Sequence, residues 1–293
     1  EDCDHLLPQV PSIPYADQDA HSKRIFDAND WRSYEISEAQ IKASRRAYFA
    51  NISYLDDKIG GILDVLEMTG QEATILFVSD HGDMLGERGL WFKMSFFEGA
   101  ARVPLMIAAP EMAPGVVTAP VSTIDICPTL CNLAGISMAE VMPWTHGESL
   151  VPLASGGARR QAVAMEYAAE ASYAPLVSLC SGWWKYIRCA LDPEQLFNLE
   201  TDPHELCNLA SNPQYAKILQ DLRDQSHALW DLDRFDAEIR ESQARRWVIY
   251  EALREGGYYP WDYQPLQKAS ERYMRNHMDL NALEAKKRVP KRT

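Results

Sequence analysis

The stretch ILFVSDHGDMLGERGLWFK, residues 75–93, decides the fold class of this chain. Its first four residues, Ile75 to Val78, are all apolar, which is typical of a short strand that helices cover on both faces. A second run of this kind occupies residues 105–108 and leads into an Ala-Pro pair. A helix, a buried strand, a loop and another buried strand in this order predict part of an α/β layered sheet.

The helix of that order is predicted over residues 37–70. Ser37 and Gln40 have the spacing of a capping box, apolar residues then recur at steps of three, four and seven, and Gly70 is a typical helix stop. The preceding residues, 8–35, carry three prolines and scattered charge without lasting periodicity. We expect an irregular surface segment there.

A smaller α+β unit is predicted in the second half of the chain. Residues 162–165 are an apolar strand run, and residues 177–180 and 183–189 flank a Ser-Gly pair that is typical of a two-residue hairpin. Residues 213–255 have a helical pattern and many charges. After them the chain combines aromatic residues and prolines with a basic end.

Composition limits the partners that the chain can have. It has 293 residues, of which 46% are apolar, and a formal net charge of −13. Such a charge disfavours nonspecific binding to nucleic acid or anionic lipid, and no apolar stretch approaches the roughly 20 residues of a membrane helix. We therefore expect neither nucleic acid nor a membrane as partner. A small cationic ligand suits this surface better.

The cysteines and the first residues indicate where the protein works and how much of it this chain represents. Six cysteines without a C-x-x-C pair are too dilute for a disulfide scaffold, so reduced thiols in the cytoplasm are expected. The opening EDCDHLLPQV does not resemble an export signal. It lacks an initial Met and is acidic and proline-rich like an interior linker, so we expect the carboxyl-terminal part of a longer protein.

Asp80 and His81 are the first candidates for chemistry, because they follow the predicted strand 75–78 directly. Ligands of open α/β sheets gather at the carboxyl ends of the strands. A carboxylate favours hard ions such as Ca²⁺, whereas an imidazole shifts the preference toward Mn²⁺ or other transition ions. The alternative is a loop-capping Asp beside an ordinary surface His, and two ligands alone do not close a metal site.

Lys93 and Glu170 each allow two interpretations. Lys93 lies among apolar neighbours and could hold an anionic group, but a lysine that extends to solvent from a half-buried helix is favoured on residue chemistry alone. Glu170 could pair with a cationic substrate, but a solvated turn residue is favoured. Asp83 and Glu87 are expected to tie down the loop rather than to transfer protons.

Four motifs in their correct order resemble sulfatases of the alkaline phosphatase superfamily. SDHGDMLGERGLWFKMSFFEGAARVPLMIAAP is similar to their second metal-binding segment, and RRAYFANISYLDDKIGGILDVL to the helix before it. VSTIDICPTLCNLAGI is similar to their D-x-x-P-T-L helix, and QLFNLETDPHELCNLA to their L-x-x-D-P-x-E-x-x-N-L-A motif. The end of the chain, YYPWDYQPLQKASERYMRNHMDLNALEAKKR, resembles the extension specific to the choline-sulfatase subfamily.

The resemblance implies a fold and a division of the chain. The expected fold is the carboxyl-terminal part of a sulfatase-type, alkaline-phosphatase-like α/β/α sandwich with a smaller α+β subdomain and an extended tail. Residues 1–157 would belong to the α/β core, residues 158–243 to the subdomain, and residues 244–293 to the tail. In the subfamily this tail reaches a neighbouring subunit, which implies a homo-oligomer, either a dimer or a tetramer.

The resemblance also assigns roles to the candidate residues. Asp80 and His81 would be ligands of a divalent metal, Ca²⁺ or Mn²⁺. Lys93 would contact the oxygens of the sulfate ester, and Glu170 would lie beside the trimethylammonium group of choline sulfate. Hydrolysis to choline and sulfate is the implied activity.

One element of this family is absent from the sequence. Sulfatases use a formylglycine, made from the Cys of a C-x-P/A-x-R motif, as their nucleophile, and no cysteine here has that context. The resemblance implies that an amino-terminal part supplies it. Two alternatives stay open: a phosphonate monoester hydrolase or phosphodiesterase of the same superfamily, and a noncatalytic choline-binding or assembly protein.

Overall fold

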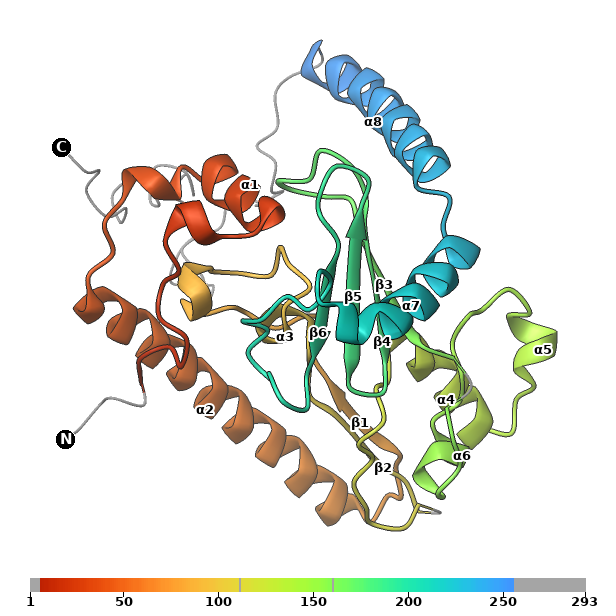
Figure 1. Cartoon of the computed structure of the whole chain (residues 1–293). Helices are drawn as coiled ribbons and strands as arrows, with labels where there is room; N and C mark the ends of the chain where they lie inside the picture. The colour runs from red at the N-terminus through yellow and green to blue at the C-terminus, as the bar shows by residue number, and fades with distance from the viewer. Residues whose placement is uncertain (1–5, 111, 160, 256–293) are drawn as a thin grey trace.

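The computed structural model describes residues 6–110, 112–159 and 161–255 (Figure 1). Its α-helices are α1 Ala20–Ala28, α2 Glu38–Thr69, α3 Glu98–Ala101, α4 Ile126–Leu133, α5 Met138–Val141, α6 Val151–Ala154, α7 Ala216–Leu229 and α8 Leu232–Glu255. Its 3-10 helices are η2 Tyr15–Asp17, η3 Trp31–Ser33, η4 Glu87–Gly89, η5 Thr123–Asp125 and η6 Pro213–Tyr215. Its strands are β1 Ile75–Val78, β2 Leu105–Ala108, β3 Val163–Tyr167, β4 Leu176–Ser181, β5 Trp184–Cys189 and β6 Gln195–Asn198. The predicted oligomerisation tail lies outside the described residues from position 256 onward.

The strands form two antiparallel sheets. β1 pairs with β2, with Ile75 opposite Ala108. The other four strands pair in the order β3-β4-β5-β6, so each connection joins neighbouring strands. Gly182, with a φ of 55°, lies in the turn between β4 and β5 and confirms the predicted hairpin.

Helix α2 confirms the predicted helix almost to the residue. The Ser37 hydroxyl accepts from the amide of Gln40 at 3.3 Å, and the Gln40 side chain accepts from the amide of Ser37 at 2.8 Å. These two bonds are the predicted capping box. Gly70 ends the helix with a φ of 64°, a conformation that favours glycine.

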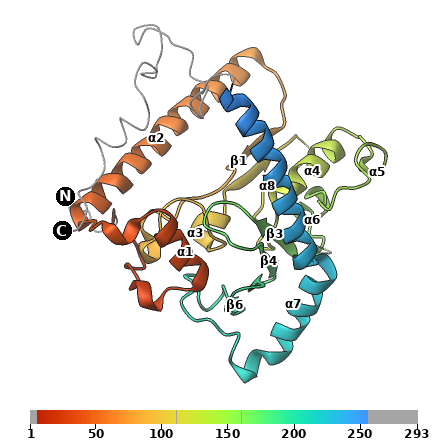
Figure 2. The same cartoon turned by 90° about the horizontal axis from the view of Figure 1, so that it is seen from above.

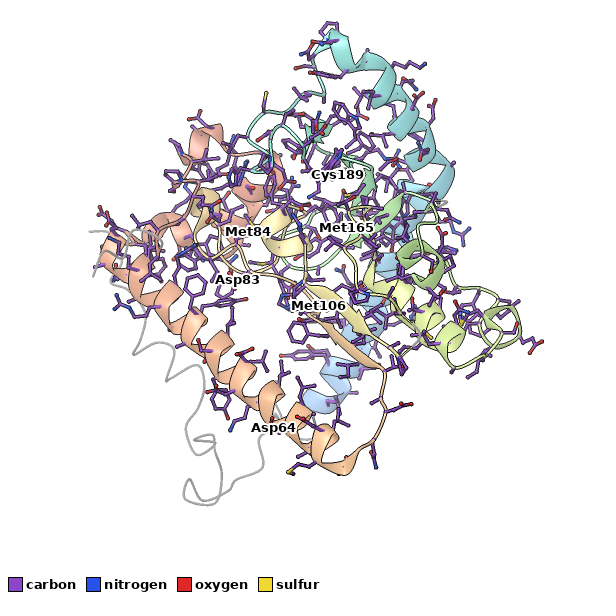
Figure 3. All side chains as sticks on the ribbon, turned by 90° about the horizontal axis from the view of Figure 1, so that it is seen from below. Asp64, Asp83, Met84, Met106, Met165 and Cys189 are labelled. Carbon is purple, nitrogen blue, oxygen red and sulfur yellow. The ribbon has the colours of Figure 1, made fainter. Side chains whose placement is uncertain are left out.

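The predicted covering of β1 and β2 on both faces is wrong for the described residues. Ile75 is 37% exposed and Met106 is 59% exposed. The apolar residues that α2 leaves exposed are Phe49, Ile52, Tyr54, Leu55, Ile62, Leu63, Val65 and Met68. Figure 3 shows side chains in the space between α2 and the strand pair, with Met106 labelled on the strands and Asp64 near the distal end of α2. An apolar run indicates which side chains avoid water, but burial depends on a partner, and no described residue covers these.

The prediction of an irregular surface segment over residues 8–35 is also wrong. Helix α1 forms there, and the Asp19 carboxylate caps it by accepting from the amide of Ser22 at 3.0 Å. The helix buries His21, Ser22 and Ile25. Because two of these three are polar, the helix shows little apolar periodicity in the sequence.

The four-stranded sheet carries a core on each face. On one face Ile187 packs with Phe96 and Phe97, which come from the segment around α3. On the other face Tyr186 packs with Leu219 of α7. Figure 2 shows α7 on one side of this sheet and α1 with α3 on the other side. Successive side chains of β5 point to opposite faces of the sheet and therefore pack against different partners, the segment around α3 and helix α7.

A buried ionic cluster joins the sheet to the segment around α3. The ammonium of Lys185, fully buried on β5, donates to the Phe96 carbonyl at 2.8 Å, to Glu98 at 2.5 Å and to Glu205 at 2.8 Å. Glu205 also accepts from the amide of Glu98 at 2.7 Å. Burial opposes the charge of Lys185, but the two carboxylates outweigh burial and raise its pKa.

A membrane span requires a helix of sufficient length and apolar character, and none of the helices in the described ranges meets both requirements.

Candidate functional site

A hollow of about 470 Å³ lies beyond the end of β1. It is lined by Ala28, Asn29, His81, Asp83, Phe92, Lys93, Met94 and Glu170. Three of the four residues predicted for the site therefore line one cavity: His81 and Lys93 from the segment between β1 and α3, and Glu170 from a distant part of the chain. The fourth, Asp80, does not line the cavity but lies beside His81.

Asp80 and His81 each place one atom that can bind a metal, Oδ2 and Nε2, next to the other. His81 Nδ1 lies 2.8 Å from the Gly82 carbonyl, and since a carbonyl only accepts, this contact assigns the proton to Nδ1. In the neutral imidazole the lone pair is then on His81 Nε2, which lies 3.3 Å from Asp80 Oδ2. Asp80 Oδ1 accepts from the amide of His81 at 2.9 Å, and this bond lowers the pKa of the carboxyl group.

This donor set fits part of a metal site. A ligating histidine commonly donates its other N–H to a carbonyl, as His81 does, and the ionised Asp80 carboxylate is 82% exposed and accessible. Among the described residues no group of three or more His, Cys, Asp or Glu side chains is placed to hold a metal. Asp80 and His81 could therefore supply two ligands to an ion whose remaining ligands come from elsewhere.

Lys93 lies in an irregular loop, so the predicted half-buried helix is wrong for this residue. Its side chain is exposed toward solvent and lines the hollow. With the part of the chain that the structure describes it forms no hydrogen bond or ion pair. An ammonium without a protein partner can bind an anionic group of a ligand.

Asp83 closes the loop that leads to Lys93. Its Oδ1 accepts from the amide of Leu85 at 2.8 Å and from the amide of Phe92 at 3.0 Å. Glu87 accepts from the amide of Val10 at 2.8 Å. These bonds confirm that the two acids tie down the loop.

Phe92 is a lining residue that the sequence did not single out. Its φ of 64° is unusual for a bulky side chain, and the bond from its amide to Asp83 helps to hold this conformation. No local pattern in the sequence signals a positive φ at a phenylalanine.

Glu170 lies in the turn after β3, so the predicted turn position is correct, and it also lines the hollow. The Tyr167 hydroxyl donates to the Glu170 carbonyl at 2.9 Å and lies 3.3 Å from its Oε2. Burial, and then the Glu170 carboxylate, raise the pKa of Tyr167, so its hydroxyl keeps the proton that it donates. The site thus combines a cation at Lys93 with an anion at Glu170.

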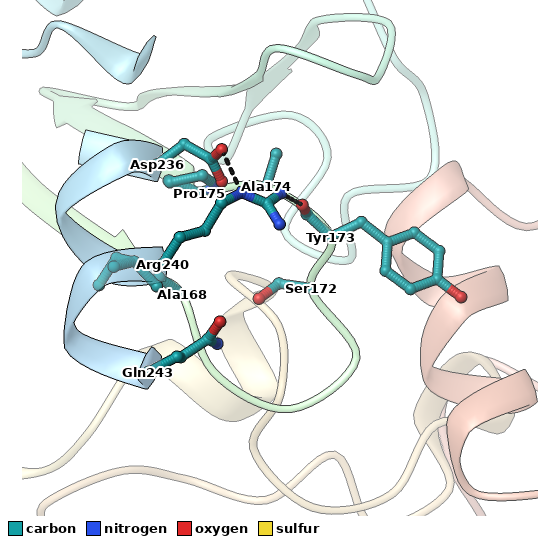
Figure 4. A pocket seen from close by; sticks show the side chains of 9 residues that line it. Ala168, Ser172, Tyr173, Ala174, Pro175, Asp236, Arg240 and Gln243 are labelled. Atoms are coloured by element: carbon teal, nitrogen blue, oxygen red, sulfur yellow. Dashed lines mark hydrogen bonds and ion pairs between the residues drawn. The ribbon is translucent and has the colours of Figure 1, made fainter. Parts of the chain in front are cut away.

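A second hollow, of about 240 Å³, lies between α8 and the connection from β3 to β4 (Figure 4). Arg240 of α8 extends across it, pairs with Asp236 at 2.6 Å and donates to the Tyr173 carbonyl at 3.1 Å. Its guanidinium is thus already engaged by protein groups. This contact ties α8 to the turn rather than forming a ligand site.

Family models match successive parts of the chain. The model "Sulfatase" matches residues 8–136, and "N-sulphoglucosamine sulphohydrolase, C-terminal" matches residues 86–231. The model "Choline sulfatase enzyme C terminal" matches residues 237–289. The last match includes most of the predicted tail.

Individual relatives agree with the family models. A choline-sulfatase of Rhizobium meliloti (strain 1021) is 61% identical over 99% of this chain and 58% of that protein. An arylsulfatase K of Danio rerio is 36% identical over 65% of this chain and 38% of that protein. The solved structure of a phosphonate monoester hydrolase from Silicibacter pomeroyi superposes with a TM-score of 0.65 and 25% identity, covering 76% of this chain and 50% of that one.

The chain spans about half the length of the relatives that it matches. The superposition and the family models confirm the predicted sulfatase-type α/β fold. From the successive family models and the 61% identity to a choline-sulfatase, we conclude that this chain belongs to the sulfatase family.

Proposed function

We propose that this chain is the carboxyl-terminal part of a choline-sulfatase, which hydrolyses choline sulfate to choline and sulfate. The observation that carries the proposal is the presence of Lys93 and Glu170 in one hollow. Choline sulfate has a sulfate at one end and a trimethylammonium group at the other, so one cation and one anion complement it. The choline-sulfatase of Rhizobium meliloti supports this choice of substrate through its 61% identity.

Lys93 and Glu170 perform electrostatic tasks in the proposed reaction. The Lys93 ammonium binds the sulfate oxygens and stabilises the charge that develops on them as the ester bond breaks. The Glu170 carboxylate attracts the trimethylammonium group and orients the ester. Both contacts also exclude esters that lack the matching charge.

Asp80 and His81 would hold a divalent metal ion, Ca²⁺ or Mn²⁺. When bound, such an ion supplies Lewis-acid polarisation of the ester. The exposed Asp80 carboxylate and the free lone pair of His81 Nε2 support this role. Replacing Asp80 by Ala should lower the metal content of the purified protein, measured by mass spectrometry of metals, whereas Asp64→Ala on α2 should not. Equal metal content in both variants would contradict the assignment.

The nucleophile is proposed to be a formylglycine in an amino-terminal part of the protein. The greater length of the matched choline-sulfatase supports such a part. Residues 1–157 then belong to the catalytic core, residues 158–243 to the smaller subdomain, and residues 244–293 to a tail that joins copies into a dimer or tetramer. The family model over residues 237–289 supports the tail as a separate unit. The proposed location is the cytoplasm.

The deciding experiment compares two substrates with the full-length enzyme. We expect a higher kcat/KM for choline sulfate than for the phenyl monoester of a phosphonate. The superposition on a phosphonate monoester hydrolase favours that activity as the second candidate, and the reverse preference would establish it. A protein with neither activity and no formylglycine by intact-mass analysis would be the noncatalytic binding protein instead.

A further inference from the structure

The two charged walls of the hollow, Lys93 and Glu170, are connected through the buried His21 and the partly buried Tyr167. His21 of α1 is 5% exposed, and its Nε2 lies 2.6 Å from the carbonyl of Met94, the residue after Lys93. Because a carbonyl only accepts, Nε2 carries the proton and donates it. This bond fixes the backbone beside Lys93 to α1.

The same histidine contacts the residue that holds Glu170. The rings of His21 and Tyr167 meet edge to face with their centroids 5.6 Å apart. The Tyr167 hydroxyl donates to the carbonyl of Glu170 and reaches its carboxylate. Within the described part of the chain, Tyr167 is the one side chain that hydrogen-bonds the Glu170 carboxylate. A continuous path of contacts therefore runs from Met94 through His21 and Tyr167 to Glu170.

Further contacts make this path stiff at its Glu170 end. The Tyr167 ring also meets the Phe96 ring edge to face, with centroids 6.5 Å apart. Ser172 donates to the Ala169 carbonyl at 2.7 Å, which closes the turn on itself. These contacts restrain the Tyr167 ring and the turn.

We infer that His21 and Tyr167 are positioning residues that set the separation between the backbone that carries Lys93 and the Glu170 carboxylate. The protein would then select esters by the number of carbons between sulfate and quaternary ammonium, in addition to the two charges. This inference rests on the proposed function, since it assigns Lys93 to the sulfate and Glu170 to the ammonium. It makes the two-carbon spacing of choline sulfate a property that the enzyme measures.

The test compares three esters with the full-length enzyme: choline sulfate, its homologue with one more methylene, and the neutral carbon isostere 3,3-dimethylbutyl sulfate. The unmodified enzyme should prefer choline sulfate to the longer homologue by about tenfold in kcat/KM, a size usual for one methylene. Tyr167→Phe removes only the hydroxyl. It should raise the KM for choline sulfate about fivefold and leave kcat nearly unchanged, because the net loss of one hydrogen bond changes binding by about this factor. The preference for the shorter ester should fall to about twofold.

Tyr173→Phe is the matched control. It removes the same atom from a tyrosine in the connection that follows β3, but Tyr173 is 69% exposed and its hydroxyl makes no hydrogen bond with a described residue. All three substrate ratios should stay as in the unmodified enzyme. His21→Gln, which retains an N–H donor but lacks the ring, should relax the chain-length preference as Tyr167→Phe does, and thermal unfolding shows whether each variant is folded.

The outcomes separate the inference from the proposed function. An unmodified enzyme that treats choline sulfate and the neutral isostere alike would overturn the proposed function. An enzyme that prefers choline sulfate, but whose Tyr167→Phe variant keeps the full chain-length preference, would overturn the inference alone. A loss of that preference in Tyr167→Phe and not in Tyr173→Phe supports it.

Discussion

The four-stranded sheet and the pair β1–β2 are both rich in apolar residues but differ in what covers them. Leu179, Tyr186 and Leu196 of the larger sheet have no exposed surface, because α7 packs on their face. Ile75 and Met106 of the pair are exposed by 37% and 59%. An apolar pattern thus determines strand and helix formation locally, whereas burial requires a partner segment.

The largest expected effect concerns the ionic cluster beneath the larger sheet. Lys185→Met should lower the free energy of unfolding by about 3–5 kcal/mol, because it leaves the carboxylate of Glu205, which is 2% exposed, buried without its cation. Lys58→Met on the exposed helix α2 should change it by less than about 0.5 kcal/mol. Urea unfolding measures both. A small loss in Lys185→Met would mean that water reaches the cluster.

The next prediction tests the comparison directly with one kind of substitution in both regions. Leu196→Ala, in the covered sheet, should cost about 2–5 kcal/mol of unfolding free energy, because a cavity remains. Leu63→Ala, on the apolar side of α2, should cost less than about 1 kcal/mol because water already reaches this side chain. Equal losses in urea unfolding would show that another segment covers α2 in solution.

Two glycines, Gly82 and Gly60, differ in the space around their backbone. A Cβ at Gly82 would lie 2.2 Å from the Gly99 carbonyl oxygen, so Gly82→Ala should force the His81 loop away from α3 and cost about 1–3 kcal/mol. A Cβ at Gly60 in α2 would meet no atom within 4 Å. Gly60→Ala should therefore stabilise the protein by about 0.5–1 kcal/mol. In thermal unfolding, the midpoint temperature should fall for Gly82→Ala and rise for Gly60→Ala.

The smallest effect is a pH dependence at His21. Burial lowers its pKa, although Asp19 and Asp192 favour its charged form and Arg24 opposes it, so the unfolded chain binds more protons below pH ~6.5. The contribution of His21 to the free energy of unfolding should thus be fully present above that pH and decline as the pH falls further. His21→Gln should flatten this decline in urea midpoints between pH 5 and 7, and His146→Gln, at an exposed position, should not. An unchanged slope in His21→Gln would contradict the prediction.

The features that local signals determine could be predicted from the sequence. The capping box at Ser37 and the stop at Gly70 gave the bounds of α2, and the position of Asp80 and His81 after β1 followed from one apolar run. Helix α1 escaped prediction because its buried side chains include His21, whose partner Met94 is far away in the chain.

The meeting of distant residues could not be predicted from patterns. Nothing near Lys93 or Glu170 in the sequence indicates that they line one cavity, and resemblance to a family was needed to expect it. The same holds for the burial of Lys185 in a strand, since the carboxylates that make it tolerable come from α3 and from the loop after β6.

The bond from the Glu98 amide to Glu205 has a consequence for how such proteins can be recombined. Glu98 follows Lys93 by one short segment, whereas Glu205 and Lys185 belong to the sheet region. A chimaera that took its carboxyl-terminal half from a relative would inherit one side of this contact without the other. Exchange of the sheet region between sulfatases should therefore give a stable protein only when the Glu98 segment is exchanged together with it.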